Sequence, residues 1–410
     1  MIKLYICGPT VYNNPHIGNL RAIVTFDLIL KAMRFLKKDF CLVHNITDID
    51  DKIINKAIES NKTEKEISEK YTQVYFNLLK MLNVDTITCV EKVTDNMDVI
   101  TKYIQRLIDT GNAYSDSEGN VWFDVQKNAD SYGCVSGQKI EKMAFEEQNI
   151  NKKFPADFAL WKNTKVGIKY NSPFGQGRPG WHTECCALID KHFSSQGVDI
   201  HSGGMDLTFP HHENENIQHF ALHNKHLASE WLRTGQINLE GVKMSKSLGN
   251  VISPEEFFNK YGVEIYKLMI LTAKFSAPIN ITEELFKNLK SVESKYIKVI
   301  FQIFLNHGNN FEKLSSSEET IKIFEALANY DFAKYNMLLN EEIKKYNKYK
   351  TYEVAQTIIT VLNILHPTLT NYKNYLESIK LFDEWRSFVE KKDYLNADIC
   401  REKLMKTGHY

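Results

Sequence analysis

The sequence predicts an α/β fold with a parallel sheet, interrupted by an inserted unit and followed by an α-helical C-terminal domain. Three observations support this class. The chain begins with alternating apolar strand and helix patterns, short strands and turns interrupt them between about residues 98 and 171, and helical periodicity prevails after about residue 254. In such folds the ligand crevice lies at the carboxyl ends of the parallel strands.

The first three elements are predicted to be a strand, a helix and a strand. An apolar run at residues 4–7 ends at a Gly-Pro turn, and residues 40–46 form a second apolar run. Between them, apolar residues recur at helical spacing over residues 17–38. This order indicates two parallel strands joined by a right-handed crossover.

Further helices and short strands follow before the sheet resumes. Residues 52–83 and 96–110 have helical patterns, and short strands follow them. A Gly- and Pro-rich segment, residues 174–181, is predicted to be a loop that leads into Cys185. Residues 198–207 are predicted to be a strand that ends in a glycine turn and rejoins the parallel sheet.

The composition is that of an ordinary globular protein and excludes several classes. With 43% hydrophobic residues and a mean hydropathy of −0.36, the chain has no apolar run long enough to span a bilayer, and we expect no membrane role. The N-terminus lacks a secretory signal, so we expect a cytoplasmic protein. Seven scattered cysteines indicate reduced thiols. The 51 basic and 51 acidic residues give no chain-wide basic surface, so any nucleic-acid contact must be local.

Two distant segments predict a site for ATP. His16 and Asn19 lie where the chain leaves the first strand and enters a helix, so backbone N–H groups and the helix dipole would face a phosphate. Lys243 and Lys246 lie in a Ser- and Gly-containing segment that suits a loop bringing positive charge to a triphosphate. Alone, each segment has a simpler interpretation: a capping histidine and a solvated basic turn.

Four residues offer the ligand types that zinc accepts. Cys7 and Cys185 supply thiolates, and His211 and Glu215, four residues apart, would project from one face of a helix. Because isolated cysteines are most often small buried hydrophobes, the residues alone leave this site open.

These segments together resemble the signature sequences of cysteinyl-tRNA synthetase, a class I aminoacyl-tRNA synthetase. The matching segments are KLYICGPTVY, RPGWHTECC, FPHHENE and KMSKS. The resemblance implies a class I Rossmann-type catalytic domain in two halves, a connective-peptide insertion, a region with the KMSKS loop and stem contacts, and a helical anticodon-side domain. Their implied bounds are residues 1–97 with 172–235, 98–171, 236–290 and 291–410.

The resemblance also implies the ligands of the site. One Zn²⁺ per chain is implied, bound by Cys7, Cys185, His211 and Glu215, and it would select the substrate because a soft thiolate is a better zinc ligand than a serine hydroxyl. The residues implied for ATP, with Mg²⁺, are Pro9, His16, Gly18, Asn19, Gly204, Asp206 and Lys246. Those implied for catalysis are His16, Asn19, Lys243 and Lys246. Those implied for the amino acid are Cys7, Thr47 and Trp181.

Simpler roles compete for some of these residues. Thr47 would also suit a helix cap, Trp181 the core, and Asp206 a turn. We expect His219 and Cys186, which neighbour the implied ligands, to be bystanders. An acidic group is predicted to cap a helix rather than bind a metal: Asp48, Asp50 and Asp51.

The chain departs from the family pattern at one signature residue and at both ends. Asn19 replaces the second histidine of HIGH, and because its amide still donates hydrogen bonds, we expect at most a moderate loss of activation. Family members usually extend further at both ends, which leaves tRNA binding less firmly implied than cysteine activation. Residues of the helical region would stack on bases and meet phosphates, or form a solvated helix face: Lys345, Tyr346, Lys348 and Tyr349.

The sequence therefore predicts a monomeric ligase that binds cysteine, ATP and tRNA(Cys). The carboxylate of cysteine would attack the α-phosphate of ATP, and the cysteinyl group would then pass to the terminal ribose of the tRNA. Two alternatives remain open: the related ligase that joins cysteine to an amino sugar in mycothiol synthesis, and a non-catalytic, zinc-containing RNA-binding relative.

Overall fold

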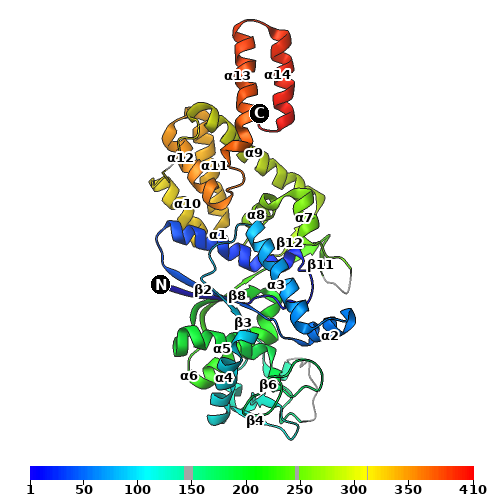
Figure 1. Ribbon diagram of the computed structural model, residues 1–410. Coiled ribbons are helices and arrows are strands. Elements are labelled where there is room, and N and C mark those ends of the chain that lie inside the picture. Colours follow the sequence, from blue (N-terminus) through cyan, green and yellow to red (C-terminus); the bar gives the residue numbers. More distant parts are fainter. Residues whose placement is uncertain (143–150, 245–248, 312) are drawn as a thin grey trace. The chain divides into compact units, whose positions relative to one another are not determined.

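The computed structural model describes residues 1–142, 151–244, 249–311 and 313–410 (Figure 1). It separates into two compact units. The first comprises residues 1–23 and 39–236, and the second comprises residues 24–38 and 237–410. The four-part division implied by the family resemblance stays a prediction.

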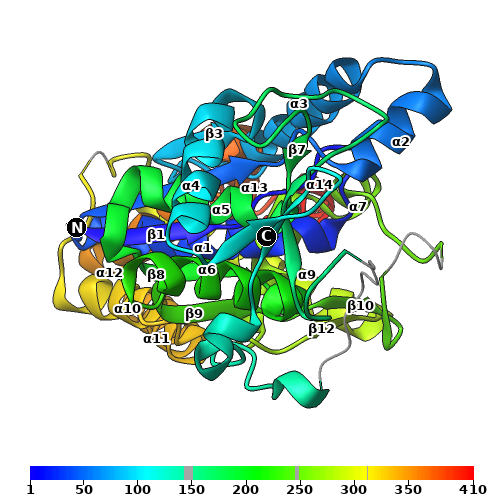
Figure 2. The same ribbon diagram turned by 90° about the horizontal axis from the view of Figure 1, so that it is seen from below.

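A five-stranded parallel sheet forms the centre of the first unit, in the order β3-β2-β1-β8-β9. Figure 2 shows β1, β8 and β9 running side by side. The order reverses at β1, which pairs with β2 on one side and with β8 on the other, so a crevice forms at the carboxyl end of β1. The predicted parallel sheet is thus confirmed. Its strands are β1 (Ile2–Ile6), β2 (Phe40–Ile46), β3 (Cys89–Lys92), β8 (Val198–Gly204) and β9 (Ala228–Thr234).

Helix α5 (Trp181–Phe193) packs on this sheet through a buried apolar cluster. Leu188 and Ile189 of the helix contact a cluster that includes Tyr5 of β1 and Val43 of β2. The prediction of a loop as far as Cys185 is wrong, because the helix begins at Trp181. The loop prediction followed the local Gly and Pro content, whereas a backbone hydrogen bond from Gly180 to the carbonyl of Leu160 fixes the chain just before the helix begins.

Three strands of the inserted segment and one strand that follows it form a four-stranded antiparallel sheet, in the order β4-β5-β6-β7. This sheet shares a buried core with α4 (Met97–Asp109) and α6 (Glu213–His223). The short strands expected within the insertion are confirmed as β4 (Ala113–Ser115), β5 (Val121–Phe123) and β6 (Phe158–Lys162). The two-residue strand β7 (Arg178–Pro179) was not expected, because it lies within residues 174–181, which were predicted to be a loop.

The remaining helices of the first unit are α2 (Asp51–Ser60) and α3 (Glu64–Met81), which pack on each other. Short 3₁₀ turns connect several elements. They are η1 (Ile17–Leu20), η2 (Thr94–Asn96), η3 (Gln126–Ser131), η4 (Ile140–Lys142), η5 (Ser194–Gln196) and η6 (Met205–Leu207).

The second unit is mainly helical and includes most of α1 (Arg21–Phe35). It also holds a small sheet in the order β11-β10-β12. Over the described ranges, no helix is both long and apolar enough to cross a bilayer. The strands of the small sheet are β10 (Ile237–Leu239), β11 (Val242–Lys243) and β12 (Ile279–Ile281). Besides α1, the helices of the second unit are α7 (Pro254–Tyr261), α8 (Val263–Thr272), α9 (Glu283–His307), α10 (Glu318–Ala328), α11 (Phe332–Tyr349), α12 (Tyr352–Leu365), α13 (Leu376–Glu390) and α14 (Tyr394–Thr407), with a 3₁₀ turn η8 (Tyr372–Tyr375).

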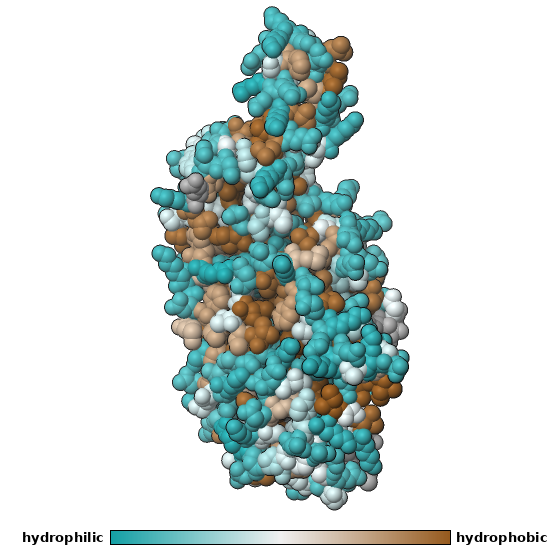
Figure 3. Space-filling model, viewed as in Figure 1, coloured by the Kyte–Doolittle hydropathy of each residue, from teal (hydrophilic) through white to brown (hydrophobic). Residues whose placement is uncertain are grey.

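The last two helices form a hairpin with a small core of its own. On α14, Ala397, Cys400 and Leu404 are buried, whereas Leu395 and Met405 are exposed. Figure 3 shows these two helices with apolar side chains at their surface beside polar ones. The helical C-terminal region expected from the sequence is confirmed.

A buried charge network stabilises the second unit. The carboxylate of Glu264 on α8 accepts hydrogen bonds from His366 Nδ1 at 2.6 Å, from Lys267 Nζ at 3.2 Å and from the hydroxyl of Thr368. Lys267 also donates to the carbonyl of Leu365 at 3.2 Å. Burial alone would raise the pKa of Glu264, but its partners outweigh burial and lower the pKa to about 2.

We expect Glu264→Gln to lower the free energy of unfolding by about 3 kcal/mol at pH 7, because it leaves Lys267 buried without its counter-ion. The folded pKa lies below the ordinary value of 4.5, so the stabilisation is complete above pH 4.5 and is lost as the pH falls toward 2. Urea unfolding of both proteins at pH 7 and pH 3.5 should therefore show a smaller difference at pH 3.5. The exposed Glu353→Gln serves as control and should change stability little. An equal difference at both pH values would contradict the prediction.

Candidate functional site

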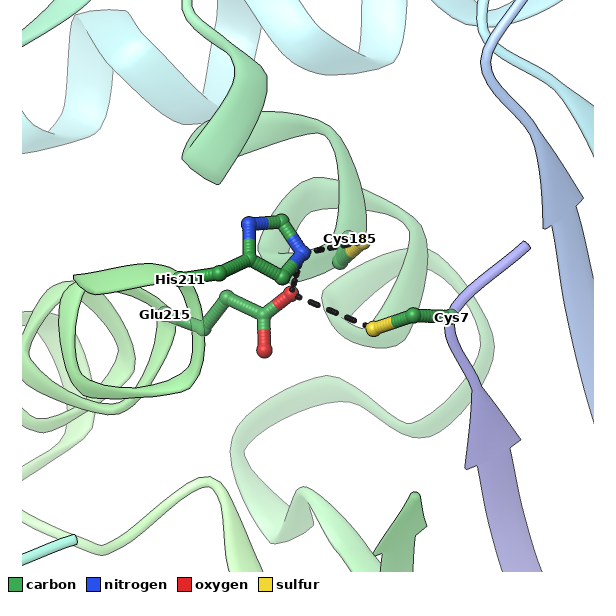
Figure 4. A group of neighbouring side chains, drawn as sticks. All are labelled: Cys7, Cys185, His211 and Glu215. Atoms are coloured by element: carbon green, nitrogen blue, oxygen red, sulfur yellow. Dashed lines mark hydrogen bonds and ion pairs between the residues drawn. The ribbon is translucent and has the colours of Figure 1, made fainter. Parts of the chain in front are cut away.

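Four of the sequence-predicted residues converge at the carboxyl end of β1. Figure 4 shows the side chains of Cys7, Cys185, His211 and Glu215 pointing toward one another. One ligand atom from each lies within 4.8 Å of the others. His211 Nε2 lies 2.9 Å from Glu215 Oε1 and 3.8 Å from Cys185 Sγ, and Cys7 Sγ lies 3.7 Å from Glu215 Oε1.

The folding of distant segments brings these residues together. Cys7 directly follows β1, and Cys185 lies on α5. His211 lies in a π-helical turn (η7, Thr208–His212), and Glu215 lies in the first turn of α6. The backbone at Gly8 packs so closely on β2 that an added Cβ would lie 1.5 Å from the carbonyl oxygen of Asn45. Only glycine fits there, and this close contact holds Cys7 at the crevice.

The electrostatics of the cluster combine deep burial with one charged pair. Desolvation raises the pKa of Cys7 to about 12 and that of Cys185 well above its ordinary value. Burial would lower the pKa of His211, but the Glu215 carboxylate outweighs it and raises the pKa to about 10. Burial would likewise raise the pKa of Glu215, which His211 and His201 instead hold well below its usual range. Two buried thiols deprotonate in such a pocket only when a cation compensates their charge.

The side chains of Cys7, Cys185, His211 and Glu215 fit a zinc ion by their chemistry. Two thiols, one imidazole and one carboxylate are ligand types of zinc sites. Glu215 Oε2 lies at ion-pair distance, 2.8 Å, from His201 Nε2, which leaves Oε1 to face His211 and Cys7. A buried carboxylate oxygen beside two thiols and an imidazole suits a divalent cation.

A second set of ligand atoms shares part of the same cluster. Cys7 and Glu215 also lie within 4.8 Å of ligand atoms of His201 and His212. However, Arg233 Nε donates to His212 Nδ1 at 3.0 Å, so the neutral ring of His212 carries its proton on Nε2, the nitrogen that faces Cys7. His212 therefore has no lone pair to offer there, and the set with His211 is the better metal site.

His182 orients the ring of His211. The two Nδ1 atoms lie 3.0 Å apart, and burial lowers the pKa of His182 well below its ordinary value, so His182 is neutral and accepts the hydrogen bond. His211 thus donates through Nδ1, and its Nε2, which faces Cys185 and Glu215, is the nitrogen from which a bound metal would displace the proton. Histidine ligands are commonly oriented by a hydrogen bond of this kind. The sequence analysis missed His182. The one hint in the sequence was that this residue lies between Trp181 and Cys185.

Trp181 and Thr47, the other residues implied for the amino acid, differ in exposure. The ring of Trp181 stacks on His211 with centroids 4.2 Å apart and is 38% exposed, so it is not a core residue. Thr47 is buried and donates to Glu184 Oε2 at 2.8 Å. It does not cap a helix, because Asp50 caps α2. Burial raises the pKa of Glu184 well above its ordinary value, and the sequence analysis missed this residue.

A cavity of about 280 Å³ lies beside this cluster. Trp181 and His182 line it on the side of His211, together with Thr10, Asp157 and Asn214. Three lysines, Lys52, Lys152 and Lys162, also line the cavity. The cluster therefore borders a space large enough for a small polar ligand.

The acidic group near α2 does not converge on one point. Asp50 accepts from the backbone N–H of Lys52 at 2.8 Å, as a helix cap does. Asp51 pairs with Arg178, and Asp48 accepts from the backbone N–H of Thr94 at 2.9 Å. Among the described residues, these carboxylates do not form a metal-binding group.

His16 and Asn19 close a capping box at η1. His16 Nδ1 accepts from the backbone N–H of Gly18 at 3.1 Å, and Asn19 Oδ1 accepts from the backbone N–H of His16 at 2.9 Å. The amide oxygen of Asn19 thus fixes the turn. Its NH₂ group remains the part that can donate to a ligand.

The other residues predicted for ATP lie on three segments. The carbonyl of Pro9 accepts from the backbone N–H of Thr47 at 3.1 Å, next to the crevice. Gly204 ends β8, and Asp206 follows in η6. Lys243 ends β11 in the second unit. Lys246 lies outside the described residues.

Solved structures of aminoacyl-tRNA synthetases share this fold. The methionyl-tRNA synthetase of Mycobacterium tuberculosis in complex with methionyl-adenylate is 13% identical with a TM-score of 0.64, covering 92% of this chain and 94% of that chain. A ternary complex of Agrobacterium radiobacter K84 LeuRS, tRNA and LeuAMS is 10% identical with a TM-score of 0.66, covering 90% of this chain and 84% of that chain. At sequence identities this low, the similarity establishes a shared fold and no more. Residues 1–291 also match the family described as tRNA synthetases class I (C) catalytic domain. The fold and this match define a class I aminoacyl-tRNA synthetase.

Proteins with similar sequences identify the family within this class. A cysteine–tRNA ligase of Mesomycoplasma hyopneumoniae strain J is 41% identical over 99% of this chain and 96% of its own length. A cysteine–tRNA ligase of Mycoplasmopsis pulmonis is 40% identical over 100% of this chain and 65% of its own length. The chain belongs to the cysteine–tRNA ligase family.

Proposed function

We propose that this protein activates cysteine with ATP and transfers the cysteinyl group to tRNA(Cys), with a zinc ion that binds the substrate thiolate. The observation that supports the zinc is the convergence of Cys7, Cys185, His211 and Glu215 within 4.8 Å. The family membership supports the reaction. When bound, zinc supplies a soft Lewis acid that favours a thiolate over the hydroxyl of serine.

The residues around the cluster have proposed roles in holding cysteine. The exposed ring of Trp181, fixed by stacking on His211, forms one wall for the amino acid. Thr47 directly follows β2 and donates its one hydroxyl proton to Glu184, and we propose that this proton turns to the substrate carboxylate when cysteine binds. A positioned carboxylate is the main requirement of the first step, because its oxygen acts as the nucleophile.

The first step joins a carboxylate oxygen of cysteine to the α-phosphorus of ATP while the bond to the pyrophosphate leaving group breaks. His16, Asn19, Lys243 and Lys246 are proposed to stabilise the charge that develops on the phosphates, with Mg²⁺ bound to ATP. In the second step a terminal ribose hydroxyl of tRNA attacks the carbonyl carbon, AMP leaves, and the hydroxyl proton is released. Neither step needs a protein nucleophile.

The reaction is tested by pyrophosphate exchange and charging assays. We expect cysteine-dependent ATP–pyrophosphate exchange and charging of tRNA(Cys), with serine at least about a hundredfold poorer as substrate. Absence of cysteine-dependent exchange would contradict the activity. Exchange that leads to ligation of an amino sugar, without charging of tRNA, would instead identify the mycothiol-type ligase.

The zinc ligands are tested with two neighbouring cysteines. Cys185 faces His211. The thiol of Cys186 instead donates to the backbone carbonyls of His182 and Glu215, and Cys186 packs in the apolar core that the antiparallel sheet shares with α4 and α6. We expect Cys185→Ser to weaken zinc binding at the cluster on the order of a hundredfold or more, because a ligand is lost. Cys186→Ser is the matched control and should keep the zinc. Atomic emission after dialysis measures the metal, and full zinc retention in Cys185→Ser would refute the ligand assignment.

Asn19 is tested by exchange kinetics. We expect Asn19→His to change ATP–pyrophosphate exchange by less than about a hundredfold, because asparagine already supplies a donor and closes the turn. Asn19→Asp keeps the acceptor for His16 N–H but loses the donor and adds a negative charge near the phosphates. It should slow exchange by about a hundredfold or more. A rise above a hundredfold in Asn19→His would show that the missing imidazole matters more than the structure indicates.

A further inference from the structure

A second group of metal-ligand side chains lies at the opposite end of α5 from Cys185. Cys89 and Glu91 lie on β3, and His192 lies in the last turn of α5. One ligand atom from each lies within 4.8 Å of the others. We propose that these three residues form a second site for a thiophilic divalent cation such as Zn²⁺, separate from the cluster at Cys7.

The separations of the ligand atoms are close to those of a zinc shell. Cys89 Sγ lies 3.5 Å from Glu91 Oε1 and 3.9 Å from His192 Nε2. Tetrahedral zinc with ordinary bond lengths requires ligand separations of roughly 3.3 to 3.6 Å. The third separation, 2.6 Å between His192 Nε2 and Glu91 Oε1, is that of a hydrogen bond and has to widen when a metal replaces the shared proton. Three protein ligands leave one position for water.

Asn96 holds the carboxylate in the orientation that this site needs. Its side-chain NH₂ donates to Glu91 Oε2 at 2.8 Å, and Asn96 is itself buried. Oε1 is therefore left to face Cys89 and His192. A carboxylate ligand whose other oxygen is hydrogen-bonded is a common feature of metal sites.

Lys191 is the cation that a metal would have to displace. Its Nζ donates to Glu91 Oε1 at 2.7 Å and to Asn96 Oδ1 at 2.8 Å, and both contacts have to break for the metal to bind. The side chain is 36% exposed, so the ammonium can move into water. The competition makes this site weaker than the four-ligand cluster, and its metal exchangeable. The side chain of His192 is 22% exposed, which gives the metal a path from solvent.

Metal stoichiometry tests the proposal. The purified protein is titrated with Zn²⁺ by calorimetry, and bound metal is counted by atomic emission. We expect wild type to take up a weak equivalent that is separate from the tight one. Cys89→Ala should weaken the second equivalent on the order of a hundredfold and keep the first, and Cys185→Ser should do the reverse. The control Cys400→Ala, at a buried thiol of α14, should keep both. No second equivalent in wild type, or full affinity for it in Cys89→Ala, would overturn the proposal.

Lys191→Met separates a metal site from a purely structural ion network. If the cluster binds metal, removal of the competing ammonium should tighten the weak equivalent by about tenfold. If Lys191, Glu91 and His192 serve only as an ion network, the variant should lose stability and gain no zinc affinity, which would overturn the proposal. Circular dichroism of each variant confirms that it is folded. The weak zinc equivalent is assigned through Cys89 and the tight one through Cys185. A negative result for the weak equivalent therefore does not bear on the proposed function.

Discussion

The first turn of α5 depends on a close contact that only glycine permits. The N–H of Gly180 donates to the carbonyl of Leu160 at 2.8 Å, and an added Cβ would lie 1.8 Å from the carbonyl oxygen of Ala159. The backbone at Gly180 is therefore fixed against β6, and the helix begins at the next residue. Trp181 and Cys185 then follow at set positions along one turn, which places the stacking ring and one thiol on the same side of the crevice.

The second constraint on the site is the burial of charge. His211 and Glu215 are a charged pair in a pocket that also holds two thiols, and three of the four residues, Cys185, His211 and Glu215, are shielded from water that could stabilise an ionised form. The half-buried Cys7 comes nearest to solvent. A pocket of this kind is costly for the bare protein, since its ionised thiols need a compensating cation. The arrangement therefore makes sense as a site whose stability depends on what it binds.

Sequence patterns predicted the elements better than the contacts between them. The second strand was predicted at residues 40–46, the bounds that β2 has, because an apolar run between turn signals is a local property. The start of α5 was missed because a contact with β6 decides it. The four residues that we propose as zinc ligands were predicted from the family resemblance, and the structure brings them together. His182, His201 and Glu184 were missed because single polar residues carry no periodic signal, and only the fold shows that they touch the site.

The pairing of β1 with β8 also affects how the chain can fold. Leu4 pairs with Ile200, so one edge of β1 has no partner until almost half of the chain has been made. At ordinary rates of synthesis this delay is on the order of ten seconds or more. Until then the nascent chain exposes an apolar strand edge and the thiol of Cys7. The contact between β1 and β8 thus sets the earliest time at which β1 can have both of its neighbours, and β9 can join the sheet only later.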